Sequence, residues 1–145
     1  MDKLVYIING PNLNLLGMRQ PEIYGSVTLQ EIEKTCGDIG DQLGFNTLFM
    51  QSNHEGEIID LIHDARGKAD GVIINPGAFS HTSVAILDAL NAYDGIVVEV
   101  HISNIHKREE FRHKSYVSLR AEAVICGFGV DGYQIALKHL GKAIR

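Results

Sequence analysis

Short runs of apolar residues alternate along the chain with longer segments in which apolar residues recur every three or four positions. The short runs are rich in the residue types that favour strands, and they fall at residues 4–8, 46–50, 71–74, 96–100 and 123–126. The longer segments have the spacing of amphipathic helices, and they occupy residues 28–43, 52–65, 80–92 and 130–143. The pattern predicts strands and helices in turn along most of the chain.

The predicted strands are apolar on both faces, which is typical of a parallel sheet covered by helices on each side. The expected fold is therefore α/β: a flavodoxin-like, doubly wound sheet of five parallel strands in a three-layer α/β/α arrangement. We expect residues 1–145 to form one domain, because 145 residues with 45% apolar content suffice for a single core. In such sheets ligands bind beyond the carboxyl ends of the strands.

Local signals mark the expected ends of the helices. Thr28 with Glu31, and Ser52 with Glu55, have the spacing of capping boxes, and Gly44 is suited to end the first helix. We expect the third helix to run from residue 80 to residue 92. We expect the last helix to turn four residues toward the core: Ile135, Ala136, Leu137 and Leu140.

Composition narrows the class of protein. The formal net charge is −5 and the isoelectric point is about 5.7, which disfavours nucleic-acid binding, since phosphate contacts need clustered Lys and Arg. No stretch approaches the roughly 20 apolar residues that cross a bilayer, so no membrane partner is expected. Cys36 and Cys126 form no C-x-x-C pair and predict reduced thiols. A cytoplasmic location is expected.

Two patterns associated with cofactors or metals do not fit their usual context. Residues 127–132 spell G-x-G-x-x-G, but they follow the last strand, and no acidic residue lies about 20 positions later. We interpret this segment as a tight turn between a strand and a helix. His54, Glu55 and His63 lack the spacing of two metal ligands on one helical face. The sequence predicts no metal and no cofactor.

The loop after the first strand is the first candidate for function. Residues 9–27 form an unusually long connection, and residues 17–26, which carry Gly at both ends of a charged stretch, have the composition of a lid. Arg19 and Tyr24 lie in this lid. A tyrosine can act as a base near neutral pH only where a nearby cation favours its phenolate form. The alternative is a solvated arginine beside a tyrosine packed under the loop.

Polar residues also follow the third and fourth strands. Asn75 ends the third strand, His81 opens the next segment, and Asp88 lies two helical turns further on. The fourth strand ends with Glu99 and His101, and a carboxylate can fix the tautomer of a histidine for proton donation. The alternatives are a helix-start histidine satisfied by backbone, and an Asp88 on a solvated helix face.

The charged stretch at residues 107–115 follows soon after. A solvated segment explains most of its members. Arg112 is the exception, because a planar guanidinium suits the recognition of hydroxyl and carboxylate groups.

These motifs, taken in order, resemble the type II 3-dehydroquinate dehydratases. The resemblance covers almost the whole chain, in three blocks. It rests on these residues: Gly10-Pro11-Asn12-Leu13-Asn14 with Gly17, Arg19, Pro21, Tyr24 and Gly25; Asn75-Pro76-Gly77-Ala78 with His81-Thr82-Ser83 and Asp88; and Glu99-Val100-His101 with Ser103-Asn104 and Phe111-Arg112-His113. The departures are Phe79, Ser80 and Ile102, where the family is expected to have Tyr, Thr and Leu.

The resemblance implies a lyase that converts 3-dehydroquinate to 3-dehydroshikimate by trans-elimination, in the shikimate pathway of aromatic amino acid biosynthesis or in quinate breakdown. It implies that Tyr24 is the base and that Arg19 stabilises its phenolate. It also implies that Asn12 holds a water against the enolate, and that His101, oriented by Glu99, is the acid.

The remaining implied roles concern binding and assembly. Hydroxyl groups would be bound by Asn75, His81 and Arg112, and the substrate carboxylate by Ile102 and Ser103. Asp88 would reach the site of a neighbouring subunit, in a homododecamer built from trimers. Two alternatives remain open: a small-ligand or flavin-binding module on the same fold, and a receiver-type signalling domain, which would want an acidic residue where Asn75 stands.

Overall fold

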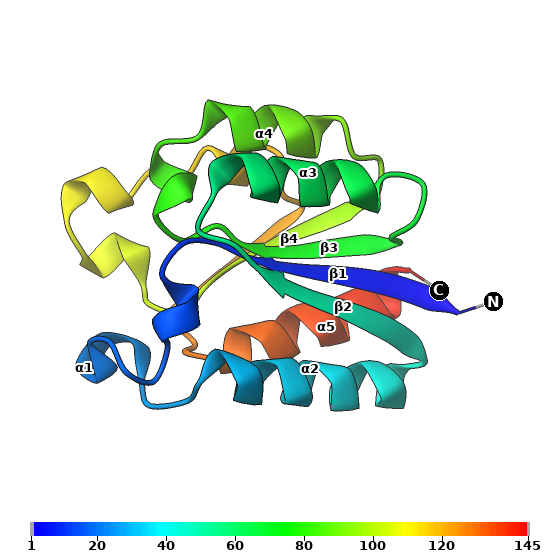
Figure 1. Ribbon diagram of the computed structural model, residues 1–145, viewed down its shortest axis with the longest axis horizontal. Helices are drawn as coiled ribbons and strands as arrows, with labels where there is room; N and C mark the ends of the chain where they lie inside the picture. Colours follow the sequence, from blue (N-terminus) through cyan, green and yellow to red (C-terminus); the bar gives the residue numbers. More distant parts are fainter. Residues whose placement is uncertain (1, 145) are drawn as a thin grey trace.

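The computed structural model describes residues 2–144, and a five-stranded parallel sheet lies at its centre (Figure 1). The strand order is β2-β1-β3-β4-β5, and the four pairings are all parallel. The strands are β1 (Lys3–Asn9), β2 (Phe45–Gln51), β3 (Gly71–Asn75), β4 (Ile96–His101) and β5 (Ala123–Cys126). The predicted positions of all five strands are confirmed to within one or two residues.

Helices cover both faces of the sheet, as expected for a doubly wound fold. They are α1 (Pro21–Tyr24), α2 (Leu29–Leu43), α3 (Glu55–Ala65), α4 (Val84–Asn91) and α5 (Asp131–Ala143). Helices α2 and α5 pack together on one face, and α3 and α4 on the other (Figure 1). The flavodoxin-like α/β/α prediction is therefore confirmed.

Two apolar cores lie between the sheet and these helix layers. Alternate strand residues divide between them, because successive side chains of a strand point to opposite faces. Val98 and Val100 belong to the core under α2 and α5, together with Tyr133 and Leu137 of α5. Val97 belongs to the core under α3 and α4. The same alternation sends the polar residues at the strand ends to different faces.

Three sequence predictions about helices need correction. The expected helix over residues 80–92 is two elements: a 3-10 helix, η2 (Gly77–His81), and then α4. Ser83 separates them, because its backbone is extended and its Oγ accepts a hydrogen bond from Ile86 N at 2.9 Å, which is how an N-cap starts a new helix. His81 therefore lies on η2 and not at the start of α4.

The second correction concerns Ser52, which does not cap α3. That helix begins at Glu55 with His54 as its N-cap residue, and the Ser52 hydroxyl instead accepts a hydrogen bond from His54 N. The third concerns Ile135, which is 40% exposed. Two residues correspond to about 200° of helical rotation, so Ile135 points away from the face that buries Tyr133 and Leu137.

Other local predictions are confirmed. The Thr28 Oγ1 accepts a hydrogen bond from Glu31 N at 3.2 Å, and α2 ends at Gly44 in the left-handed conformation. The glycine-rich segment after β5 is a tight turn: Gly127 has φ of 87°, and Gly129 donates its N–H to Ile102 O at 3.0 Å. This turn carries the chain from β5 to the first turn of α5.

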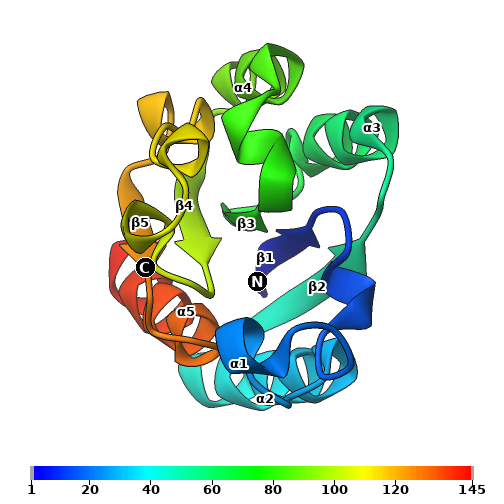
Figure 2. The same cartoon turned by 90° about the vertical axis from the view of Figure 1, so that its left-hand side faces the viewer.

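Short 3-10 helices and α1 surround the carboxyl ends of the strands, the edge onto which Figure 2 looks. Besides η1 (Leu13–Leu15) and η2, three of them follow β4: η3 (Ile105–Lys107), η4 (Glu110–Arg112) and η5 (Val117–Leu119). None of the described helices is both long enough and apolar enough to cross a membrane.

Candidate active site

A pocket opens at this edge of the sheet, between the loop after β1 and the segments that follow β3 and β4. Its empty space is about 520 Å³, including a part that opens to solvent. Nine residues singled out from the sequence line it: Asn12, Arg19, Tyr24, Asn75, His81, His101, Ile102, Ser103 and Arg112. Residues that lie as much as 100 positions apart in the chain thus share one cavity.

Glu99 and His101 form a buried pair at the end of β4. His101 Nε2 hydrogen-bonds to Glu99 Oε2, and the Glu99 side chain is fully buried. Because a carboxylate can only accept, Nε2 carries a proton, and Nδ1 is the ring nitrogen left for a ligand in the pocket. The pair holds the imidazole ring of His101 in one orientation.

Two serines hold the other lone pairs of the Glu99 carboxylate. Ser115 Oγ donates to Oε2 at 2.7 Å, and Ser118 Oγ donates to Oε1 at 2.6 Å. Burial alone would raise the pKa of Glu99, but the hydrogen bond and charge of His101 and the two serine hydroxyls together lower the pKa below its usual value. Glu99 is therefore an anion at neutral pH despite its burial.

His81 presents a different histidine to the pocket. Its Nδ1 lies 2.8 Å from Lys114 O, and since a carbonyl can only accept, Nδ1 carries the proton. Burial lowers the pKa of His81, and the positive charges of His101 and Arg112 lower it further, against the raising effect of the bond to Lys114. Neutral His81 thus offers Nε2 as a hydrogen-bond acceptor.

Two guanidinium groups flank Tyr24. The Cζ of Arg19 lies 5.0 Å from the centre of the Tyr24 ring. Arg108 Nη1 donates to the Tyr24 hydroxyl at 3.0 Å and to Ser103 Oγ at 3.2 Å, with its Cζ 5.5 Å from the same ring. Arg108 thus contacts the phenol oxygen directly, while Arg19 lies over the ring.

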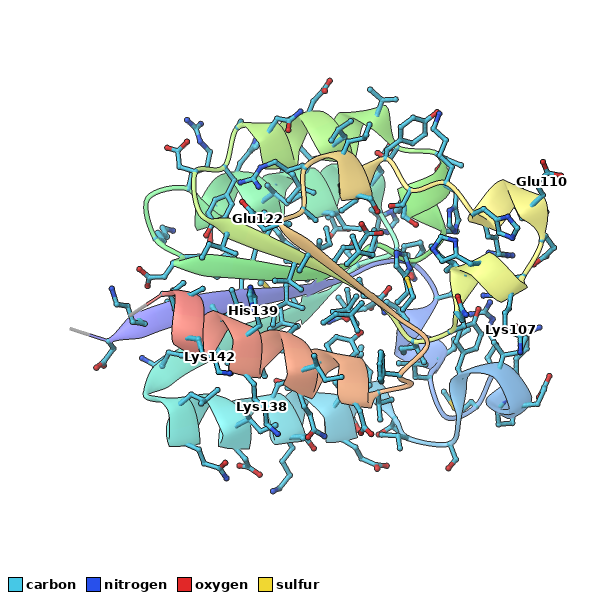
Figure 3. All side chains as sticks on the ribbon, turned by 180° about the vertical axis from the view of Figure 1, so that it is seen from behind. Lys107, Glu110, Glu122, Lys138, His139 and Lys142 are labelled. Carbon is cyan, nitrogen blue, oxygen red and sulfur yellow. The ribbon has the colours of Figure 1, made fainter. Side chains whose placement is uncertain are left out.

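Arg108 was missed by the sequence reasoning, which treated it as part of a solvated stretch. Most of that stretch is indeed exposed, and Figure 3 shows Lys107 and Glu110 pointing outward from it. The Arg108 side chain is only 17% exposed and turns inward. The one signal in the sequence was its position, because Arg108 follows soon after the end of β4, where Glu99 and His101 lie.

The segment at residues 17–26, which the sequence analysis interpreted as a lid, has unusual backbone conformations at several points. Gly17 and Gly25 have φ of 88° and 81°, and Gln20 has φ of 44°, a conformation uncommon for residues with a side chain. Gly17 lies so close to Ser26 that a Cβ on Gly17 would sit 2.9 Å from Ser26 O. The two ends of the segment therefore meet, with α1 and Tyr24 between them.

Asn12 also has a positive φ, 69°, at the mouth of the pocket. The end of β2 supports it: Asn12 N donates to Asn53 Oδ1 at 3.0 Å, and Gln51 Nε2 donates to the same oxygen. Such strained positions persist where the surroundings over-determine them and are common at functional sites.

The structure places Arg112 and Asp88 less directly. Arg112 lines the pocket while its Nε donates to Glu109 Oε1 at 2.9 Å, so part of its guanidinium is already paired. Asp88 is exposed on α4 and lies outside the residues that line the pocket. Within a single chain, therefore, Asp88 does not form part of this pocket.

Among residues 2–144, no group of three or more His, Cys, Asp or Glu side chains is arranged to hold a metal ion. The pocket contains a histidine that is hydrogen-bonded to a buried carboxylate, a tyrosine between two guanidinium groups, and several amide and hydroxyl groups. This set suits proton transfer on a small polar anion.

Residues 3–141 match the profile of the family described as Dehydroquinase class II. The chain belongs to this family. It is 65% identical over 137 residues to 3-dehydroquinate dehydratase 2 of Agrobacterium fabrum, covering 94% of this chain and 93% of that protein. It is 59% identical over 140 residues to 3-dehydroquinate dehydratase of Cereibacter sphaeroides (strain ATCC 17029 / ATH 2.4.9), covering 97% and 95%.

Solved structures agree with the sequence comparisons. The type II dehydroquinase from Propionibacterium acnes superimposes with a TM-score of 0.94 at 42% identity, covering 98% of each chain. The resemblance drawn from the motifs is confirmed, and the chain is an enzyme of the hydro-lyase class. Family membership decides against the flavin-binding and receiver alternatives.

Proposed function

We propose that the enzyme removes water from 3-dehydroquinate to give 3-dehydroshikimate, with Tyr24 as base and His101 as acid. One observation carries the proposal: a tyrosine bonded to a guanidinium and a histidine bonded to a buried carboxylate line the same pocket. The trans-elimination of water beside a ketone needs one group to take a proton and another to give one.

The first step is proton abstraction. Tyr24, as the phenolate, removes a proton from the carbon beside the ketone, and the electron pair of that C–H bond moves into an enolate. Arg19 and Arg108 stabilise the phenolate before the step, and their charge also favours the enolate that replaces it. Asn12, at the pocket mouth, holds a water against the enolate oxygen.

The second step is loss of the hydroxyl group. The enolate electrons re-form the ketone and the new C=C bond, while the C–O bond breaks and His101 protonates the departing oxygen to give water. His101 gives its second proton, from Nδ1, because Nε2 is bonded to Glu99. The anionic Glu99 stabilises the doubly protonated imidazolium that this step requires.

The remaining residues bind the substrate. Asn75, His81 and Arg112 contact its hydroxyl groups, with neutral His81 accepting a hydrogen bond at Nε2. The substrate carboxylate is bound by Ile102 and Ser103 at the end of β4. Residues 17–26 close over the bound molecule as a lid, which excludes water and strengthens the electrostatic effect of the two arginines.

The proposal extends to the assembly and the setting. Asp88, which its own pocket does not use, contacts the site of a neighbouring subunit in a homododecamer built from trimers. The enzyme works in the cytoplasm, in the shikimate pathway or in quinate breakdown. No metal or cofactor takes part in the mechanism.

The test begins with ultraviolet detection of a conjugated enone when purified protein meets 3-dehydroquinate. Isotope exchange at the carbon beside the ketone then separates the two roles. We expect the exchange to survive in His101→Ala, which blocks only the second step, and to vanish in Tyr24→Phe. Exchange that persists in Tyr24→Phe would show that another residue is the base.

A further inference from the structure

A buried chain of three hydrogen-bonded side chains lies behind the pocket, and only its last member, Asn75, lines the pocket. Tyr133 Oη donates to Asn9 Oδ1 at 2.6 Å, and Asn75 Nδ2 donates to Tyr133 Oη at 3.0 Å. Asn9 and Tyr133 are fully buried, and Asn75 is 3% exposed. Neither Asn9 nor Tyr133 was singled out from the sequence as a functional residue.

The fold brings these residues together from three elements. Asn9 ends β1 and Asn75 ends β3, and the two are register partners in adjacent parallel strands, so their side chains point to the same face. Tyr133 comes from the first turn of α5, which packs on that face. Gly132 allows the close approach, since a Cβ there would lie 3.1 Å from Val100 Cγ1.

Backbone groups fix the direction of every hydrogen bond in this chain. At one end, Asn9 Nδ2 donates to Met50 O at 3.0 Å, and a carbonyl can only accept, so Asn9 must turn its oxygen toward Tyr133. At the other end, Gly77 N donates to Asn75 Oδ1 at 3.2 Å, and a backbone N–H can only donate. The bonds at Asn9 and at Asn75 therefore require the same direction of hydrogen-bond donation along the three side chains.

The consequence is a defined donor at the pocket wall. Tyr133 gives its single proton to Asn9, so its oxygen can only accept from Asn75, which must present its NH₂ group. One N–H of that group is used by Tyr133 and the oxygen by Gly77. The second N–H is the one that can meet an oxygen lone pair of a ligand in the pocket.

We infer that Tyr133 is a positioning residue for substrate recognition, which holds Asn75 as a hydrogen-bond donor toward a substrate hydroxyl oxygen. The inference rests on the proposed function for the identity of the substrate. Burial raises the pKa of the Tyr133 hydroxyl well above its usual value, so this group keeps the proton that it donates to Asn9. Tyr133 touches no ligand itself and acts only through Asn75.

Kinetics of Tyr133→Phe, Asn75→Ala and the double variant test this. Loss of one hydrogen bond from the chain should lower kcat/KM by about 2- to 13-fold in Tyr133→Phe. In the Asn75→Ala background the same change should alter kcat/KM by less than about twofold, because the path through Asn75 is already gone. Equal losses in both backgrounds would overturn the inference.

Tyr93→Phe is the matched control. Tyr93 is 3% exposed and its hydroxyl donates to Ala69 O at 2.7 Å, near the amino ends of the strands and far from the pocket. This variant loses a comparable buried bond and should lose a comparable part of its stability. We expect its kcat/KM to stay at the wild-type value, so a loss there equal to that of Tyr133→Phe would also overturn the inference.

Asn9→Ala tests the polarity itself with Tyr133 and Asn75 both kept. Without its acceptor, Tyr133 is free to donate to Asn75 Oδ1 and to favour the flipped amide, so kcat/KM should again fall. An unchanged kcat/KM would show that the direction of these hydrogen bonds has no effect on recognition, and it would overturn the inference. This variant also keeps the inference testable where Tyr133→Phe does not fold.

A readout without substrate separates this inference from the proposed function. In NMR spectra of the free protein, the side-chain NH₂ signals of Asn75 should shift and exchange faster in Tyr133→Phe, and stay in place in Tyr93→Phe. If the Asn75 signals do not move in Tyr133→Phe, the inference is wrong, whatever activity the variant has. Wild-type protein that fails to dehydrate 3-dehydroquinate sinks the proposed function, whereas the NMR result still stands.

Discussion

Removing the guanidinium of Arg108 should slow the enzyme by one to two orders of magnitude. Arg108 Nη1 lies 3.0 Å from the Tyr24 hydroxyl and 3.2 Å from Ser103 Oγ, and its side chain is 17% exposed. A hydrogen bond to a charged group in such a place contributes about 1.5–3 kcal/mol. Since 1.36 kcal/mol is a factor of ten in rate, Arg108→Ala should lower kcat/KM by about 12- to 160-fold.

The loss should fall on the first chemical step. Arg108→Lys keeps the charge but replaces the planar fork with a point donor, so its kcat/KM should lie between those of the wild type and the alanine variant. Isotope exchange beside the ketone should slow in Arg108→Ala by the same factor as turnover. Both measurements follow the proton that Tyr24 removes in the proposed mechanism.

Arg66→Ala is the control for charge alone. Arg66 is an exposed arginine that caps the end of α3 and lies outside the residues lining the pocket. Its loss changes the net charge by the same amount and should leave kcat/KM unchanged. The reasoning is refuted if Arg108→Ala stays within twofold of the wild type, or if Arg66→Ala loses as much.

Three further predictions concern other parts of the molecule. Ser118→Ala removes a donor that holds the pKa of Glu99 low; the pKa should rise, and the acidic limb of the kcat/KM profile should move to higher pH, whereas an unmoved limb would contradict the role of Ser118. Asp88→Ala should dissociate the assembly or lower kcat/KM, as seen by analytical ultracentrifugation and steady-state kinetics; a fully active monomer would count against this. Dialysis against EDTA should leave turnover intact, since residues 2–144 contain no cluster suited to a metal, and recovery by one divalent ion would reverse the view.

The fold could be predicted from the sequence because strands buried on both faces leave a simple signal. Runs such as residues 71–74 contain only apolar residues and Gly, and no helix of that length is stable alone. The break at Ser83 could not be predicted so easily. Its hydroxyl competes with helix continuation only because the bond to Ile86 N forms in the folded chain, and an apolar pattern runs through both elements.

Site residues could be predicted from the sequence where their residue type is rare at the end of a buried strand. Glu99 and His101 stand out because a fully buried strand seldom finishes with two ionisable groups. Arg108 was lost among the charges around it, since the contact that matters joins it to Tyr24, 84 residues away in the chain. Ser115 and Ser118 were lost for the same reason, because nothing in their own segment indicates a buried carboxylate nearby.

Tyr133 shows the converse problem, a functional contact hidden in an apolar stripe. Its spacing to Ala136, Leu137 and Leu140 is that of a core residue, and most of its ring is one. Only its hydroxyl is polar, and its value depends on two amides that belong to other elements. A pattern that records residue types along the chain cannot register such a contact.

The two faces of the sheet support the two ends of the proposed chemistry separately. Glu99 and His101 point to the face of α4, where Ser115 and Ser118 hold the carboxylate. Asn75 points to the face of α5, where Tyr133 holds its amide. Because strand residues alternate, β3 and β4 can deliver an acid and a recognition group to one pocket while drawing on two separate layers for their orientation. A substitution in the layer of α5 can therefore alter substrate recognition by Asn75 without moving His101, the proposed acid. This would not be possible if one helix layer oriented both residues.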